Sequence, residues 1–168
     1  LNNEIEKTRK ELANLFQLDT RKKWILHPGL FTGGKGINTI ASSLPTTLDS
    51  HFILMGSHGP KIKDQLFSQN LISNLKEKYS LFKLILSPDD ATFKKMLLAS
   101  DLVLLPYDVG VSERRSSLLS AMSCGANVFT SIGRFSAPLN LQDSGAYLIS
   151  LEDWKKTKAL PLIKQALL

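Results

Sequence analysis

Short apolar segments and amphipathic helical patterns alternate along the chain, and this alternation restricts the possible folds more than any other feature. The run Leu102–Leu105 is apolar at every position, as expected of a strand buried on both faces. Further strands are predicted over residues 24–27, 52–55 and 82–86, between Gly125 and Thr130, and over 147–149. Strands that alternate with helices indicate a parallel sheet.

Helical patterns fill the intervals between the strands. They are predicted over residues 3–17, 35–44 and 61–79, from the start signal Ser87-Pro88-Asp89-Asp90, after Ser112, and from Glu152 with an interruption at Pro161. The inward face of the helix over 61–79 is predicted to carry Ile62, Leu66, Leu71, Ile72, Leu75 and Tyr79. The sequence therefore predicts an α/β fold: a Rossmann-like parallel sheet of about six strands with helices on both faces.

The length and composition are typical of one globular domain. Residues 1–168 form a single predicted domain, with a leading helix over 1–20 and the Rossmann-like core over 21–168. Because the chain begins at Leu1 rather than at a methionine, we expect it to be a piece of a larger protein.

The net charge of +6 fits an anionic substrate, nucleic acid or an acidic membrane surface. Nucleic acid is the weakest of these, because no basic patch is interleaved with aromatic residues. The single cysteine, Cys124, excludes an internal disulfide. His27, His51 and His58 are too scattered for a metal site. No metal is expected, because Lys35 and the arginines can supply the positive charge that a divalent ion would bring to an anionic ligand, and no cofactor is expected either.

A first glycine-rich segment covers residues 28–36, between a predicted strand and a helix. Gly33 and Gly34 would let the backbone approach a ligand, and Lys35 would bring a positive charge to the helix start. The segment lacks the spacing and the Ser or Thr of a Walker A loop. The alternative is that it merely connects the strand to the helix.

A second segment, residues 107–117, follows the apolar strand. Ser112 could cap the next helix, and Arg114 and Arg115 would flank its first turn. Positive charges at a helix N-terminus interact unfavourably with the helix dipole, and an anion bound between the two arginines would offset this. The pattern therefore favours a phosphate-bearing ligand. In the alternative, Glu113 pairs with one arginine and the other is solvated.

The order of these motifs resembles the C-terminal, donor-binding domain of GT-B glycosyltransferases, in the large family 4 group. The resemblance spans residues 22–168. It rests on Lys35-Gly36, on HFILMGSHGP and SDLVLLPY, and on the stretch from Ser112 to Thr130. It implies one half of a GT-B fold, with the diphosphate of a nucleotide sugar lying between the two segments.

The resemblance also implies roles for individual residues. Lys35, Arg114 and Glu113 would be catalytic. The donor would be bound by Gly33, Gly34, Lys35, Gly56, Ser87, Ser112, Arg115, Ser116, Ser117 and Ser120. The chain departs from the family at Leu30, where many members carry arginine, and at Ser112 and Ser120, where the family carries a pair of glutamates.

By this resemblance, the chain is expected to be the nucleotide-sugar-binding half of a retaining hexosyltransferase. Its acceptor would be a carbohydrate or a lipid-linked molecule, bound by an N-terminal domain absent from this chain, so the fragment should be inactive alone. Cell-envelope polysaccharide synthesis is the expected role. The expected location is the cytoplasm, with peripheral association of the full-length protein at the inner face of the membrane. The alternative is a degenerate nucleotide-binding or scaffold domain without activity.

Overall fold

A computed structural model describes residues 2–45, 49–112, 115–134, 136, 146–150, 152–153 and 159–167. Six strands form one sheet in the order β3-β2-β1-β4-β5-β6, and all neighbouring strands are parallel. The strands are β1 (Lys23–Phe31), β2 (Ser50–His58), β3 (Phe82–Leu86), β4 (Leu102–Leu105), β5 (Val128–Ile132) and β6 (Tyr147–Ser150). The predicted fold class is confirmed, and the strand order is that of the doubly wound Rossmann fold.

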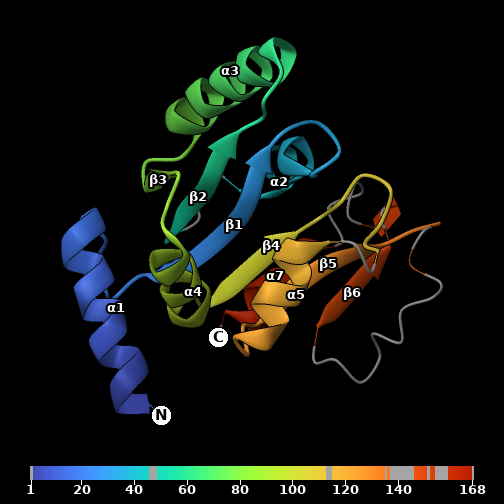
Figure 1. Cartoon of the computed structure of the whole chain (residues 1–168). Coiled ribbons are helices and arrows are strands. Elements are labelled where there is room, and N and C mark those ends of the chain that lie inside the picture. Colours follow the sequence, from blue (N-terminus) through green and yellow to red (C-terminus); the bar gives the residue numbers. More distant parts are fainter. Residues whose placement is uncertain are drawn as a thin grey trace.

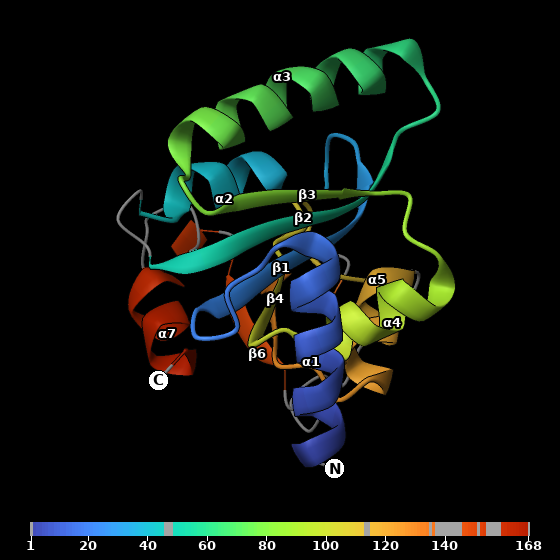
Figure 2. The same ribbon diagram turned by 90° about the vertical axis from the view of Figure 1, so that its left-hand side faces the viewer.

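Helices cover both faces of this sheet (Figures 1 and 2). The helices are α1 (Asn2–Phe16), α2 (Ile37–Ser43), α3 (Ile62–Lys78), α4 (Asp90–Ala99), α5 (Ser116–Ser123) and α7 (Ala159–Ala166). One face packs against α1, α4 and α5, and the other against α2, α3 and α7. Within the described part of the chain, no helix is both long and apolar enough to cross a membrane.

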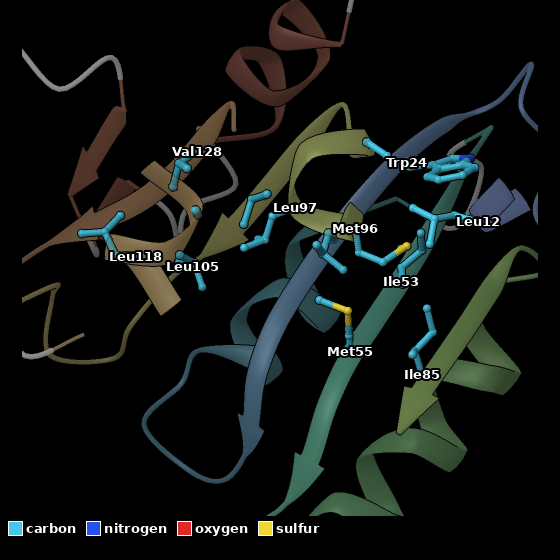
Figure 3. Close-up of a cluster of buried hydrophobic side chains, with 14 of the residues drawn as sticks. Leu12, Trp24, Ile53, Met55, Ile85, Met96, Leu97, Leu105, Leu118 and Val128 are labelled. Atoms are coloured by element: carbon cyan, nitrogen blue, oxygen red, sulfur yellow. The ribbon is translucent and has the colours of Figure 1, made fainter. Parts of the chain in front are cut away.

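The core consists of two apolar layers, one on each side of the sheet. Alternate residues of β1 serve different layers: Trp24 and Leu26 pack toward α1 and α4, whereas Ile25 packs toward α2 and α3. Figure 3 shows the first layer, in which Met96 and Leu97 of α4 meet the strands. Every residue of β4 is buried, as the apolar run predicts, because β4 lies between β1 and β5.

Strand β1 is longer than the sequence predicts. It continues through Pro28 and Gly29 to Phe31, and these residues pair with β2. The prediction that Pro28 ends the strand is wrong. Strand β4 pairs only with Ile25 and Leu26 of β1 and does not reach Pro28. The N–H that proline lacks is therefore not needed for a hydrogen bond to β4.

Two helix predictions also need correction. Ile62 and Leu66 are 77% and 58% exposed, because α3 buries no residue before Ser68 and its first turn does not pack on the core. Pro161 does not interrupt a helix. It lies within the first turn of α7 as described, where proline is tolerated, and the helix continues through it. Residues 154–158 of the predicted helix lie outside the described part of the chain.

Candidate functional site

The carboxyl ends of β1 and β2 come unusually close to each other at paired glycines. Gly29 pairs with Gly56, and a Cβ added to Gly56 would lie 1.7 Å from the carbonyl oxygen of Gly29. A Cβ added to Gly29 would lie 3.1 Å from the Ser117 hydroxyl oxygen at the start of α5. The glycines thus let β1, β2 and α5 converge at one point of the sheet.

A pocket of about 290 Å³ opens at this point. It is lined by Gly29, Leu30, Lys35, Gly56, Ser57, Pro88, Phe93, Ser116 and Ser117. A second hollow of about 340 Å³ is lined by Asp90, Phe93, Lys94, Ser116, Ser117 and Ser120. Because the two share Phe93, Ser116 and Ser117, they form one cleft at the carboxyl end of the sheet, where ligands of open α/β sheets bind.

The first predicted segment forms part of this cleft, although its helix begins later than predicted. Helix α2 starts at Ile37, and Gly36 precedes it with a φ of 71°. A Cβ on Gly36 would lie 1.4 Å from the carbonyl oxygen of Pro106. The Asp108 N–H also donates to the carbonyl of Gly34 (3.3 Å). These contacts fix the β1–α2 segment against the segment that follows β4.

Lys35 and Arg115 meet over the ring of Tyr107. The Lys35 ammonium lies 5.6 Å from the ring centroid, and the Arg115 guanidinium carbon lies 4.5 Å from it. Among the described residues, neither cation has a carboxylate within salt-bridge distance. The Arg115 Nε is buried without a hydrogen-bond partner there. The described part of the chain therefore presents two positive charges beside the cleft and no acidic partner for either.

The pKa values around Lys35 reflect this concentration of charge. Burial, and then the positive charge of Arg115, lower the pKa of Lys35. Burial raises the pKa of Tyr107 to about 12, although Arg115 and the nearby Ser117 hydroxyl act against it. An anion between Lys35 and Arg115 would relieve their mutual repulsion.

His27 is a buried polar residue next to this group. Its Nδ1 lies 2.7 Å from the Leu104 carbonyl oxygen, and its Nε2 has no hydrogen-bond partner among the described residues. Burial lowers the pKa of His27 to about 4, and the charge of Lys35 adds to this effect. The ring is therefore neutral at pH 7, and its Nδ1–H donates to the carbonyl.

The second predicted segment is placed in part. Ser112 does not cap a helix: α5 begins at Ser116, and Arg115 occupies the cap position without a capping side chain. The Ser112 carbonyl instead accepts the Arg115 N–H (3.1 Å). Glu113 and Arg114 lie outside the described residues, so their proposed roles remain predictions from the resemblance.

The remaining predicted residues are distributed around the cleft. Lys35, Gly56, Ser116, Ser117 and Ser120 line it, and Arg115 lies beside Lys35. The hydroxyl of Ser87 lies 3.2 Å from that of Ser57, which lines the pocket. Gly33 is exposed and lines neither hollow.

Several cleft residues escaped the sequence analysis. They are Ser57, Pro88, Asp90, Phe93 and Lys94. Tyr107, whose ring lies under Lys35 and Arg115 without lining the cleft, was also not identified. Phe93 lies on α4 and also packs partly against the core. The position of the helix start at Asp89-Asp90, directly after β3, was the available signal, because the carboxyl ends of parallel strands share one edge. Asp89 is the observed N-cap: its carboxylate accepts the Thr92 N–H (2.6 Å).

The fold is similar to part of several solved glycosyltransferase structures. They include a sucrose-phosphate synthase from Thermosynechococcus elongatus (18% identity over 95% of this chain, TM-score 0.74). A glycosyltransferase from Rickettsia africae also matches (14% identity over 96% of this chain, TM-score 0.72). So does Anabaena HepE in complex with UDP and glucose (16% identity over 96% of this chain, TM-score 0.68). No family model and no curated protein matches the sequence.

The similarity covers less than half of each solved structure. This chain spans 39% of the sucrose-phosphate synthase chain, 42% of the Rickettsia enzyme and 44% of HepE. The six-stranded sheet with helices on both faces corresponds to one half of their GT-B fold. At these identities, the similarity defines the fold of the chain and no more than the fold.

Proposed function

We propose that the chain binds the diphosphate of a nucleotide sugar in the cleft at the start of α5 and is the donor half of a family 4 glycosyltransferase. The observation that carries this proposal is the convergence of Lys35 and Arg115, two cations without a described counter-ion, next to a glycine-lined pocket. A diphosphate would supply a counter-charge to both, and its oxygens fit the donors of a guanidinium.

The proposed reaction transfers a hexosyl group to a carbohydrate or lipid-linked acceptor with retention of configuration. The bond between the anomeric carbon and the β-phosphate oxygen breaks, and its electron pair stays on that oxygen. The acceptor hydroxyl oxygen forms the new bond to the anomeric carbon and gives its proton to the departing diphosphate. Lys35 and Arg115 stabilise the charge that develops on the leaving group.

Several parts of this proposal rest on the sequence resemblance. The acceptor site would lie in an N-terminal domain, so that this chain alone should bind the nucleotide and transfer no sugar. The proposed setting is cell-envelope polysaccharide synthesis at the cytoplasmic face of the membrane. Arg114 would add a third cation, and Glu113 would be catalytic.

A second candidate is a nucleotide-binding module without transfer activity. Ser120 lines the cleft at a position where the resemblance implies a glutamate that grips the ribose hydroxyls. A hydroxyl is a weaker partner for a sugar diol than a carboxylate. Sugar transfer by a longer protein that includes this chain would exclude this candidate.

Calorimetric titration of the 168-residue chain with UDP tests the proposal. Lys35→Ala and Arg115→Ala should each weaken UDP binding about tenfold to a hundredfold, because each removes a charge-assisted contact to phosphate. Uridine should bind weakly and be insensitive to either change.

Lys78→Ala is the matched control. Lys78 is also a cation over a tyrosine ring, with its Nζ 5.2 Å from the Tyr79 centroid at the far end of α3. Its loss changes the net charge by the same amount and should leave UDP affinity within about twofold. Equal affinity for uridine and UDP, or wild-type UDP affinity in both cleft variants, would overturn the proposed function.

A further inference from the structure

Tyr107 is the buried residue that both cations of the cleft share. Its side chain is 1% exposed, and it follows β4 directly after Pro106. We propose that Tyr107 is a positioning residue of the anion site: its ring holds Lys35 and Arg115 together over one surface before the ligand arrives. This inference rests on the proposed function and extends it to a residue that does not line the pocket.

Two like charges in a half-buried site repel each other and would otherwise turn toward solvent. The electron-rich face of an aromatic ring attracts a cation, and desolvation strengthens this attraction. The described residues offer neither cation a carboxylate that could do the same. The Tyr107 ring is thus the observed attraction that keeps Lys35 and Arg115 in place, which lowers the entropic cost of binding.

The ring of Tyr107, rather than its hydroxyl, has this role. The hydroxyl is buried and makes no hydrogen bond of ordinary geometry among the described residues, although the Ser117 hydroxyl lies near enough to lower the pKa of the phenol. The contacts to Lys35 and Arg115 both involve the ring face. Phenylalanine should therefore replace Tyr107 without loss of anion binding, whereas an aliphatic residue should not.

Tyr79 offers an internal comparison. It is also a buried tyrosine with a lysine over its ring, but it lies on the face covered by α2 and α3. Its hydroxyl donates to the Leu44 carbonyl (2.9 Å). Tyr79→Leu therefore removes a buried ring of the same size at a position away from the cleft. It shows how much affinity is lost through a weakened core alone, without loss of the ring that contacts Lys35 and Arg115.

The experiment measures the affinity of the full chain for UDP and for inorganic pyrophosphate. Tyr107→Phe should keep both affinities within about twofold of wild type, and Tyr107→Leu should lower both about tenfold or more. Tyr79→Leu should leave both within about twofold. In a Lys35→Met background, Tyr107→Leu should lower the two affinities only about threefold, because one of the two cations that contact the ring is already absent.

Two further measurements cover the case in which Tyr107→Leu does not fold. Phenylalanines with one, two and three ring fluorines at position 107 fill nearly the same space with a progressively weaker ring face, so affinity should fall stepwise along the series. In the unliganded protein, the Lys35 ε-methylene and Arg115 δ-methylene resonances should show upfield ring-current shifts. Tyr107→Phe should preserve these shifts.

Each other result overturns one of the two proposals. An equal loss in Tyr107→Phe and Tyr107→Leu would assign the role to the hydroxyl and overturn the ring inference. Constant affinity along the fluorine series, or an undiminished cost of Tyr107→Leu in the Lys35→Met background, would also overturn it while leaving the proposed function intact. Failure of the wild-type chain to bind both UDP and pyrophosphate would overturn the proposed function, and the ring inference with it.

Discussion

At the scale of single residues, three glycines between β1 and α2 differ in the space around them. At Gly36 the backbone has a φ of 71°, and an added Cβ would overlap the carbonyl of Pro106. At Gly34 the φ is 81°, but an added Cβ would meet no heavy atom within 4 Å. Gly33 has neither constraint. The three positions therefore separate backbone strain from a steric clash.

Alanine substitutions should reproduce this order in the free energy of unfolding, measured in urea. We expect Gly33→Ala to change it by less than about 0.5 kcal/mol and Gly34→Ala to lower it by about 1–2 kcal/mol through strain alone. Gly36→Ala should cost roughly 3 kcal/mol or more, because the Pro106 segment must also move. An equal loss in the free energy of unfolding for Gly34→Ala and Gly36→Ala would show that the close contact with Pro106 does not affect stability.

At the scale of secondary-structure elements, Arg9 attaches α1 to the sheet. Its guanidinium donates to the carbonyls of Ala99 and Lys22 (2.7 Å each) and lies 2.9 Å from an Asp101 carboxylate oxygen. It also covers the ring of Trp24 at 4.2 Å from the centroid. One side chain of α1 thus joins three other segments at the amino end of the strands.

Arg9→Met should lower the free energy of unfolding by about 3 kcal/mol, because it leaves the part-buried Asp101 carboxylate and two carbonyls with fewer partners. Arg9→Lys should recover less than half of this loss, since an ammonium cannot donate in all of these directions. Arg21→Met is the control. The Arg21 side chain is 87% exposed, so the loss of its solvent-screened ion pair with Asp19 should leave the free energy of unfolding nearly unchanged. Urea unfolding measures all three, and full recovery in Arg9→Lys would contradict the role of the guanidinium fork.

At the scale of the whole molecule, His27 couples stability to pH. Its pKa is about 4 in the native protein, against 6.5 for an ordinary histidine. As the pH falls from 6.5 to 4, the unfolded chain takes up a proton at His27 while the native protein does not. The free energy of unfolding should therefore fall in this window, by about 3 kcal/mol in total, and be fully recovered above it.

The variant His27→Gln separates the contribution of His27 to this pH dependence from the contributions of other residues. His27→Gln should flatten the slope between pH 4 and 6.5. His51, whose pKa is also lowered by burial, should supply a smaller remaining slope of the same sign. Asp19, with a pKa of about 2 because of its bonds to Arg21, should act only below about pH 4. Chemical denaturation at each pH measures these slopes. If the free energy of unfolding of His27→Gln fell with pH as steeply as that of the wild type, the burial of a neutral His27 ring would be contradicted.

The sequence by itself determined the fold class and much of the order of its elements. The consecutive apolar residues of Leu102–Leu105 identified an interior strand, and the acidic start at Asp89-Asp90 identified α4. These signals are local, since burial on both faces and helix capping each leave a pattern within a few residues. The glycine and arginine segments were also visible as candidates for anion binding.

The tertiary structure alone decided how far β1 extends and which cations meet. Pro28 would end a strand by its local preference, but the pairing with β2 carries β1 past it. Lys35 and Arg115 lie far apart in the sequence, and they meet because β1 and β4 are neighbours in the sheet. The sequence around Tyr107 did not indicate its contacts. An aromatic residue after a proline looks the same in the sequence whether its ring contacts two cations or only the hydrophobic core. Contacts between distant segments follow from strand order, which local periodicity does not encode.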